Sequence, residues 1–93
     1  MNKAELITSM AEKSNLTKKD AELALKAFIE SVSETLENGD KVQLVGFGTF
    51  ETRVRAEREG RNPRTKETIN IPASTVPVFK AGKEFRSRVN GEA

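Results

Sequence analysis

Apolar residues recur at helical spacing over the first 37 positions of the chain. A first set, beginning at Leu6 and Ile7, follows Asn2, which has Glu5 three residues on in the pattern of a capping box. This predicts a short amphipathic helix up to about Ser14. A second start signal, Thr17 with Asp20, precedes a longer apolar stripe that stops at 38–39, an Asn-Gly pair. The stripe of this longer helix comprises Ala21, Leu25, Phe28, Ile29, Val32 and Leu36.

The second predicted helix carries more apolar surface than one short neighbouring helix could cover. Leu23, Ala24 and Ala27 widen its stripe. We interpret this second face as a dimerisation surface. Packing of the same face on the chain's own sheet is an equally open alternative.

From Asp40 onward the pattern alternates with a period of two, which is typical of strands. Residues 41–45 and a run beginning at Thr49 are joined by Gly46-Phe47-Gly48, and this predicts a β-hairpin. The run that begins at Thr49 is longer than its partner at 41–45, and the alternating pattern resumes at 68–73. We therefore expect the unpaired end of this run to pair with 68–73 and form an arm.

The predicted arm covers residues 53–75, with its tip in the turn-forming segment around Pro63. Ten residues per strand give a reach of roughly 33 Å. Because an isolated two-stranded ribbon is marginally stable in water, we expect the arm to be mobile until it meets a surface.

The last part of the chain is predicted to return to the body. Val76, Val78 and Phe79 indicate a closing strand, and 83–89 indicate a short helix with Phe85 turned inward. We assign all five phenylalanines to the core, which leaves no aromatic platform for stacking single-stranded bases. The fold class is therefore α+β, in a single domain of residues 1–93 with a helical part (1–40) and a part containing the sheet, arm and last helix (41–93).

Composition excludes most enzyme classes for this chain. The 93 residues include no cysteine and no histidine, so disulfides, thiolate or imidazole metal ligands and Ser-His-Asp chemistry are ruled out. The carboxylates are scattered, so we expect no metal, no cofactor, no small-molecule substrate and no enzymatic activity. No signal peptide and no apolar run of about 20 residues is visible, which predicts a cytoplasmic protein without membrane contact.

Charge is distributed unevenly along the chain. Residues 1–40 carry five Lys/Arg and eight Asp/Glu, a net charge of −3, whereas residues 41–93 carry eleven and six, a net charge of +5. Between 53 and 66 there are six cations and two anions, and five of the cations are arginine, the residue best suited to phosphate and narrow-groove contacts. This favours nucleic-acid binding, although cations also protect exposed strand edges from aggregation.

Several motifs resemble those of the bacterial histone-like HU and IHF family across nearly the whole chain. They are Met1-Asn2-Lys3, the segment from Gly39 to Phe50 with its Gly-Phe-Gly turn, Gly60-Arg61-Asn62-Pro63-Arg64-Thr65, Ile71-Pro72-Ala73-Ser74 and Phe79-Lys80-Ala81-Gly82-Lys83. The resemblance implies an intertwined dimer with two N-terminal helices, a three-stranded antiparallel sheet, a long β-hairpin arm and a short C-terminal helix in each chain. It also implies arms that wrap the DNA minor groove and a tip proline, here Pro63, that intercalates at a kink.

The resemblance further implies roles for individual residues. The cations expected to line the groove and its phosphates are Arg53, Arg55, Arg58, Arg61 and Arg64. Asn62 would support the tip, and the residues expected to hold flanking phosphates are Lys3, Lys80, Lys83 and Arg86. Lys66 departs from the family pattern, which often has glycine or asparagine there; it adds a charge that can reach a phosphate, but a left-handed backbone at this position would cost lysine roughly 1 to 2 kcal/mol.

The expected function is therefore largely sequence-independent binding, bending and compaction of chromosomal double-stranded DNA in the nucleoid, with bent, nicked or gapped sites preferred. The expected assembly is a homodimer, or a heterodimer with a paralogue. Two other functions are weighed against this one: a sequence-specific bender of the IHF type, and a protein-interaction module whose arm swaps between subunits.

Overall fold

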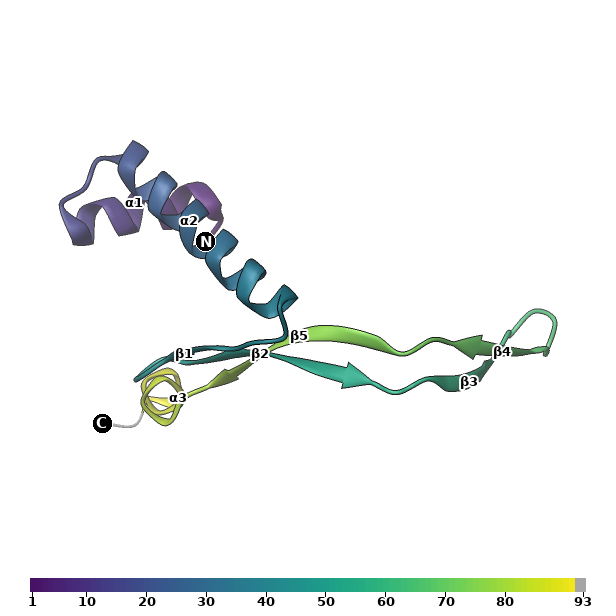
Figure 1. Cartoon of the computed structure of the whole chain (residues 1–93). Coiled ribbons are helices and arrows are strands. Elements are labelled where there is room, and N and C mark those ends of the chain that lie inside the picture. The colour runs from purple at the N-terminus through teal and green to yellow at the C-terminus, as the bar shows by residue number, and fades with distance from the viewer. Residues whose placement is uncertain (92–93) are drawn as a thin grey trace. The chain divides into compact units, whose positions relative to one another are not determined.

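The computed structural model describes residues 1–91, which divide into two compact units, Met1–Thr35 and the chain from Leu36 onward (Figure 1). The first unit contains helix α1 (Lys3–Ser14) and most of helix α2 (Lys18–Glu37). The second contains strands β1 (Val42–Leu44), β2 (Gly48–Arg55), β3 (Arg58–Arg61), β4 (Thr68–Ile71) and β5 (Ser74–Ala81), and helix α3 (Lys83–Asn90). This is the predicted α+β fold.

Both N-terminal helices begin at the predicted start signals. The side chain of Asn2 accepts a hydrogen bond from the Glu5 N–H at 2.9 Å, and the Thr17 hydroxyl accepts one from the Asp20 N–H at 3.1 Å. Helix α1 ends at Asn15, whose φ of 60° is left-handed, and α2 is followed by a turn at Gly39, where φ is 78°. The predicted helices are confirmed.

The body of the second unit is a three-stranded antiparallel sheet in the order β1-β2-β5. Strand β1 pairs with β2 through Val42–Phe50 and Leu44–Gly48, which confirms the predicted hairpin. Glycine is required at position 48, because a Cβ there would lie 2.5 Å from both the Phe79 ring and the Lys80 carbonyl oxygen. The Gly-Phe-Gly segment therefore supplies close packing as well as a turn.

The arm is a separate two-stranded sheet, β3 with β4, which continues away from the main sheet (Figure 1). Its tip lies in the turn at 62–67, as predicted. The β2–β5 ladder extends to the pair Arg55–Ser74, and the β3–β4 ladder begins at Arg58–Ile71. Residues 53–55 and 74–75 of the predicted arm therefore belong to the main sheet. Between the two ladders, residues 56–57 and 72–73 are not paired. One of these residues is Pro72, which has no N–H to donate.

The assignment of all five phenylalanines to a core holds only in part. Phe47, Phe79 and Phe85 form a ring cluster, with centroids 4.7 Å apart for Phe47–Phe85 and 5.2 Å for Phe47–Phe79, and Phe50 joins it at 4.8 Å from Phe79. However, Phe28, Phe47 and Phe79 remain about 40% exposed in the single chain. Within residues 1–91, the buried apolar side chains are Ala11 and Ala21. One chain is too small to enclose its larger apolar side chains.

Candidate nucleic-acid interface

The tip of the arm is a tight turn closed by backbone and side-chain hydrogen bonds. The Asn62 N–H donates to the Glu67 carbonyl at 2.9 Å, and the Lys66 N–H donates to the Asn62 carbonyl at 2.7 Å. The Asn62 side-chain oxygen also accepts from the Arg64 N–H at 2.9 Å. Asn62 thus organises the turn through three of its polar groups, and Pro63 lies exposed at its outer end.

Lys66 adopts the left-handed backbone conformation within this turn, with φ of 61°. Within the described chain, Asn15 and Lys66 are the two non-glycine residues with positive φ, and Asn tolerates this region far better than Lys. The departure noted in the sequence therefore carries a conformational cost at the tip.

The cations at the base of the arm lie on one face of the main sheet. The register pairs Arg53 with Val76, Arg55 with Ser74 and Thr49 with Lys80. Because directly paired residues share a face and alternate residues along a strand repeat it, Arg53, Arg55 and Lys80 point to the same side. The opposite side carries Phe50 and Phe79 of the ring cluster.

Lys80 also has a partner within the chain. Its Nζ lies 3.0 Å from a carboxylate oxygen of Glu51, on the same face of the sheet. The hydrogen bond from Lys80 lowers the pKa of Glu51 below its ordinary value, and the charges of Lys80, Lys41 and Arg53 add to the effect. Glu51 is therefore ionised at neutral pH and competes with any phosphate for Lys80.

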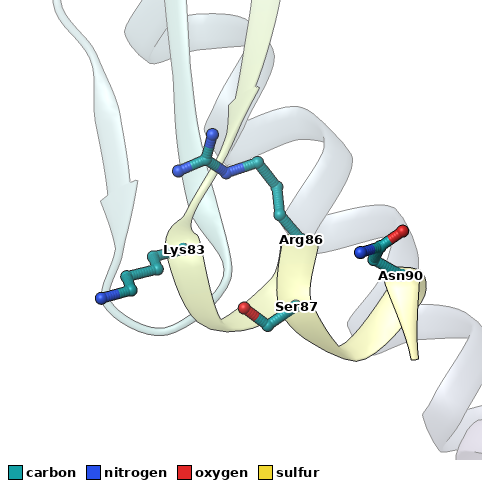
Figure 2. Close-up of a pocket in the computed structure, with 4 residues that line it drawn as sticks. All are labelled: Lys83, Arg86, Ser87 and Asn90. Atoms are coloured by element: carbon teal, nitrogen blue, oxygen red, sulfur yellow. The ribbon is translucent and has the colours of Figure 1, made fainter. Parts of the chain in front are cut away.

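Helix α3 presents a polar hollow of about 340 Å³ lined by Lys83, Arg86, Ser87 and Asn90 (Figure 2). These residues have spacings of three, four and seven from Lys83, which place them on one face of a helix. The sequence predicts Lys83 and Arg86 as phosphate contacts, and the structure places Ser87 and Asn90 beside them in the same hollow. Their helical spacing from Lys83 was the signal that could have found them.

Lys3 lies in the helical unit and lines a hollow of about 640 Å³ between the starts of α1 and α2. Lys18 and Lys19 line the same hollow together with Glu22. No sequence pattern connects these two lysines with Lys3, because only the packing of the helix pair brings the three together.

The predicted residues thus form several groups. The arm and its tip hold Arg58, Arg61, Asn62, Pro63, Arg64 and Lys66. The sheet face holds Arg53, Arg55 and Lys80, helix α3 holds Lys83 and Arg86, and the helical unit holds Lys3. No group of acidic side chains that could hold a metal ion occurs in the described chain, and no helix between residues 1 and 91 is long and apolar enough to cross a membrane.

Comparisons with known proteins agree on one family. Residues 1–90 match the family model described as bacterial DNA-binding protein. The chain is 86% identical over 90 residues to DNA-binding protein HU of Clostridium pasteurianum, covering 97% of this chain and 99% of that one. It is 60% identical over 88 residues to DNA-binding protein HU of Lactococcus lactis, covering 95% and 97%. Among solved structures, an Anabaena HU–DNA cocrystal structure is similar with a TM-score of 0.90 and 55% identity, covering 96% of this chain and 97% of that one.

Proposed function

This chain belongs to the bacterial HU family of DNA-binding proteins, and we propose that it bends double-stranded DNA by laying its arm in the minor groove. It is an architectural DNA-binding protein and not an enzyme. The relatives named above are HU proteins, and no comparison favours the sequence-specific IHF-type alternative.

The observation that carries the proposal is the arm itself. A two-stranded ribbon rich in arginine extends from the sheet and ends in an ordered turn with an exposed proline. Arginine side chains suit the narrow, negatively charged minor groove. Pro63 has no N–H and a compact apolar ring, so it acts as a wedge that enters a base step and kinks the duplex.

The cations of the body extend this contact along the DNA. Lys80, Lys83, Arg86 and Lys3 hold phosphates on either side of the kink, and Arg53 and Arg55 hold them where the arm leaves the sheet. Such contacts position the protein without reading base sequence, and they make binding dependent on salt concentration.

The active form is a homodimer, with a heterodimer of two paralogues as the alternative assembly. The exposure of large apolar side chains supports this: Phe28 is 41% exposed and Ile29 is 50% exposed on α2, in a chain of only 93 residues. Burial of such side chains against a second chain would supply the missing core. Two arms could then grip one duplex at two points.

Bent, nicked or gapped DNA is the preferred ligand, because a kink costs less free energy where the stack is already broken. Many dimers acting along the chromosome would compact it, which places the protein in the nucleoid.

The function is tested by titrating matched intact and nicked duplexes at several salt concentrations, with end-to-end FRET as the measure of bending. We expect tighter binding to the nicked duplex, a steep loss of affinity with salt and a shortened end-to-end distance. Binding that is independent of salt, or an unbent duplex, would refute the proposal. The Pro63→Ala variant is the matched control: it should dimerise normally and lose bending more than affinity.

A further inference from the structure

The last residue of helix α3 is an asparagine that is followed by a glycine. Asn90 ends the helix and is exposed, and Gly91 follows it with a left-handed φ of 81°. A Cβ built on Gly91 would meet no atom of the described chain within 4 Å. The Asn90–Gly91 peptide therefore lies at an open end of the helix, and residue 91 has no side chain to cover its backbone nitrogen.

Hydrogen bonds hold this nitrogen in place while the last turn of α3 is closed. The Gly91 N–H donates to the carbonyl oxygen of Ser87 and, at 3.3 Å, to that of Arg88. The N–H of Gly39, which follows helix α2, lies closer to its acceptor, 3.0 Å from the Leu36 carbonyl oxygen. Helix ends open far more often than helix interiors, and α3 has only eight residues. The Gly91 nitrogen is thus released repeatedly while the rest of the protein stays folded.

We propose that Asn90 is a site of spontaneous deamidation, which turns a neutral side chain beside the cations of α3 into a carboxylate. Asparagine is among the thermolabile residues. When the last turn opens, the Gly91 nitrogen attacks the side-chain carbonyl carbon of Asn90, its proton passes through water to the amide nitrogen, and ammonia leaves. Water then opens the five-membered imide to aspartate, or to isoaspartate where the other carbonyl is attacked. One water is consumed and one ammonia is released, without oxidation or reduction.

The new carboxylate would stand among cations that we assign to DNA phosphates. Asn90 lines the same hollow as Lys83 and Arg86 (Figure 2), and Arg86 precedes it by four residues, the spacing at which side chains on a helix meet. The carboxylate competes with a phosphate for Arg86, and it also lies at the negative end of the helix dipole, which loosens the last turn. DNA binding through α3 should therefore weaken as the protein ages. This consequence rests on the proposed function, whereas the reaction itself does not.

The reaction is tested by ageing the full chain without DNA at neutral pH and mapping its peptides by mass spectrometry. We expect the side-chain amide to be lost at Asn90 and retained at Asn70, which precedes a bulky isoleucine. Gly91→Asn is the matched control, because asparagine tolerates the left-handed φ but places a Cβ beside the attacking nitrogen, so it should slow the loss at Asn90. Loss at Asn90 no faster than at Asn70, or undiminished loss in Gly91→Asn, would overturn the proposal.

The consequence is tested with Asn90→Asp, which sets the product in place, and Asn90→Gln, which keeps an amide. Fluorescence anisotropy with a nicked duplex at low salt should show about two- to fivefold weaker binding for Asn90→Asp than for Asn90→Gln, and the difference should shrink as salt rises. Equal affinities of the two variants would overturn the proposed effect on DNA binding. If replacing both Lys83 and Arg86 with Gln leaves affinity unchanged, the proposed phosphate contact of α3 is refuted instead, and the mass-spectrometric result still decides the reaction.

Discussion

Replacing Lys66 with glycine should close the arm tip more firmly in the free protein. The left-handed φ of 61° costs a residue with a Cβ about 1 to 2 kcal/mol, and glycine avoids this cost. Glycine also gains more conformational entropy than lysine when the turn opens, which stabilises the open state by about 0.5 to 1 kcal/mol and partly offsets this gain. With the middle of each range, the balance favours the closed turn by about 0.75 kcal/mol, which corresponds to a two- to fivefold decrease in open molecules.

Amide hydrogen exchange measures this change at the turn itself. The N–H groups of Lys66 and Asn62 donate the two backbone hydrogen bonds, 2.7 and 2.9 Å long, that close the tip. Their exchange should slow by the same two- to fivefold in Lys66→Gly, provided that exchange occurs through opening of the turn. Lys66→Asn should change exchange in the same direction, because asparagine tolerates the left-handed region.

Lys66→Arg is the matched control, since arginine keeps both the charge and the Cβ. Its amide exchange and the salt dependence of its DNA binding should match those of the unchanged protein. In the glycine variant, the slope of log affinity against log salt concentration should become shallower by about 0.9 for each phosphate contact that is lost. Unchanged or faster exchange in both Lys66→Gly and Lys66→Asn would refute the strain argument. An equal gain in Lys66→Arg would refute it as well.

Three further predictions concern the body of the protein. Glu51→Gln should raise DNA affinity a few-fold by freeing Lys80. Because the pKa of Glu51 is lowered, its ion pair with Lys80 is present above the unfolded pKa and is lost only as pH falls through the folded pKa. In fluorescence anisotropy, the DNA affinity of the unchanged protein should therefore not rise across the neutral pH range. Replacing both Lys83 and Arg86 with Gln should reduce the salt slope by about 1.8 per chain and leave FRET-measured bending of the bound duplex unchanged. Ile29→Ala should weaken the dimer by about 2 to 5 kcal/mol per chain in sedimentation equilibrium if Ile29 is buried between chains; an effect within about 0.5 kcal/mol would mean that it stays exposed.

The helices and the turns could be predicted because their signals are local. The side chains of Asn2 and Thr17 cap helices through hydrogen bonds to residues three positions on, and the turns at Gly46 and Asn62 need only a few neighbouring residues. Each of these structures is fixed by residues that are close in the sequence.

Features that depend on pairing between distant segments could not be predicted in the same way. The ion pair of Lys80 with Glu51 and the hydrogen bond of Asn70 with Glu57 depend on how the strands are aligned, and alternation alone leaves that register open. The interruption of the ladder next to Pro72 has the same origin, as has the packing of Ile71 over Gly60. The resemblance to a family supplied the role of the arm but neither of these two side-chain pairings.

The charge of the arm also bears on the order of events during binding. The ribbon from 56 to 73 carries four cations and three anions, a net charge of only +1, despite its arginines. Long-range attraction to DNA follows local net charge. Helix α3, with three cations and one anion, carries +2 over its eight residues, against +1 over the eighteen residues of the ribbon. We therefore expect the body to dock first and the arm to enter the groove afterwards. In stopped-flow experiments, replacing Lys83 and Arg86 with Gln should slow association and weaken its salt dependence, while Pro63→Ala should alter only the later bending step; slower initial association in Pro63→Ala would refute this order.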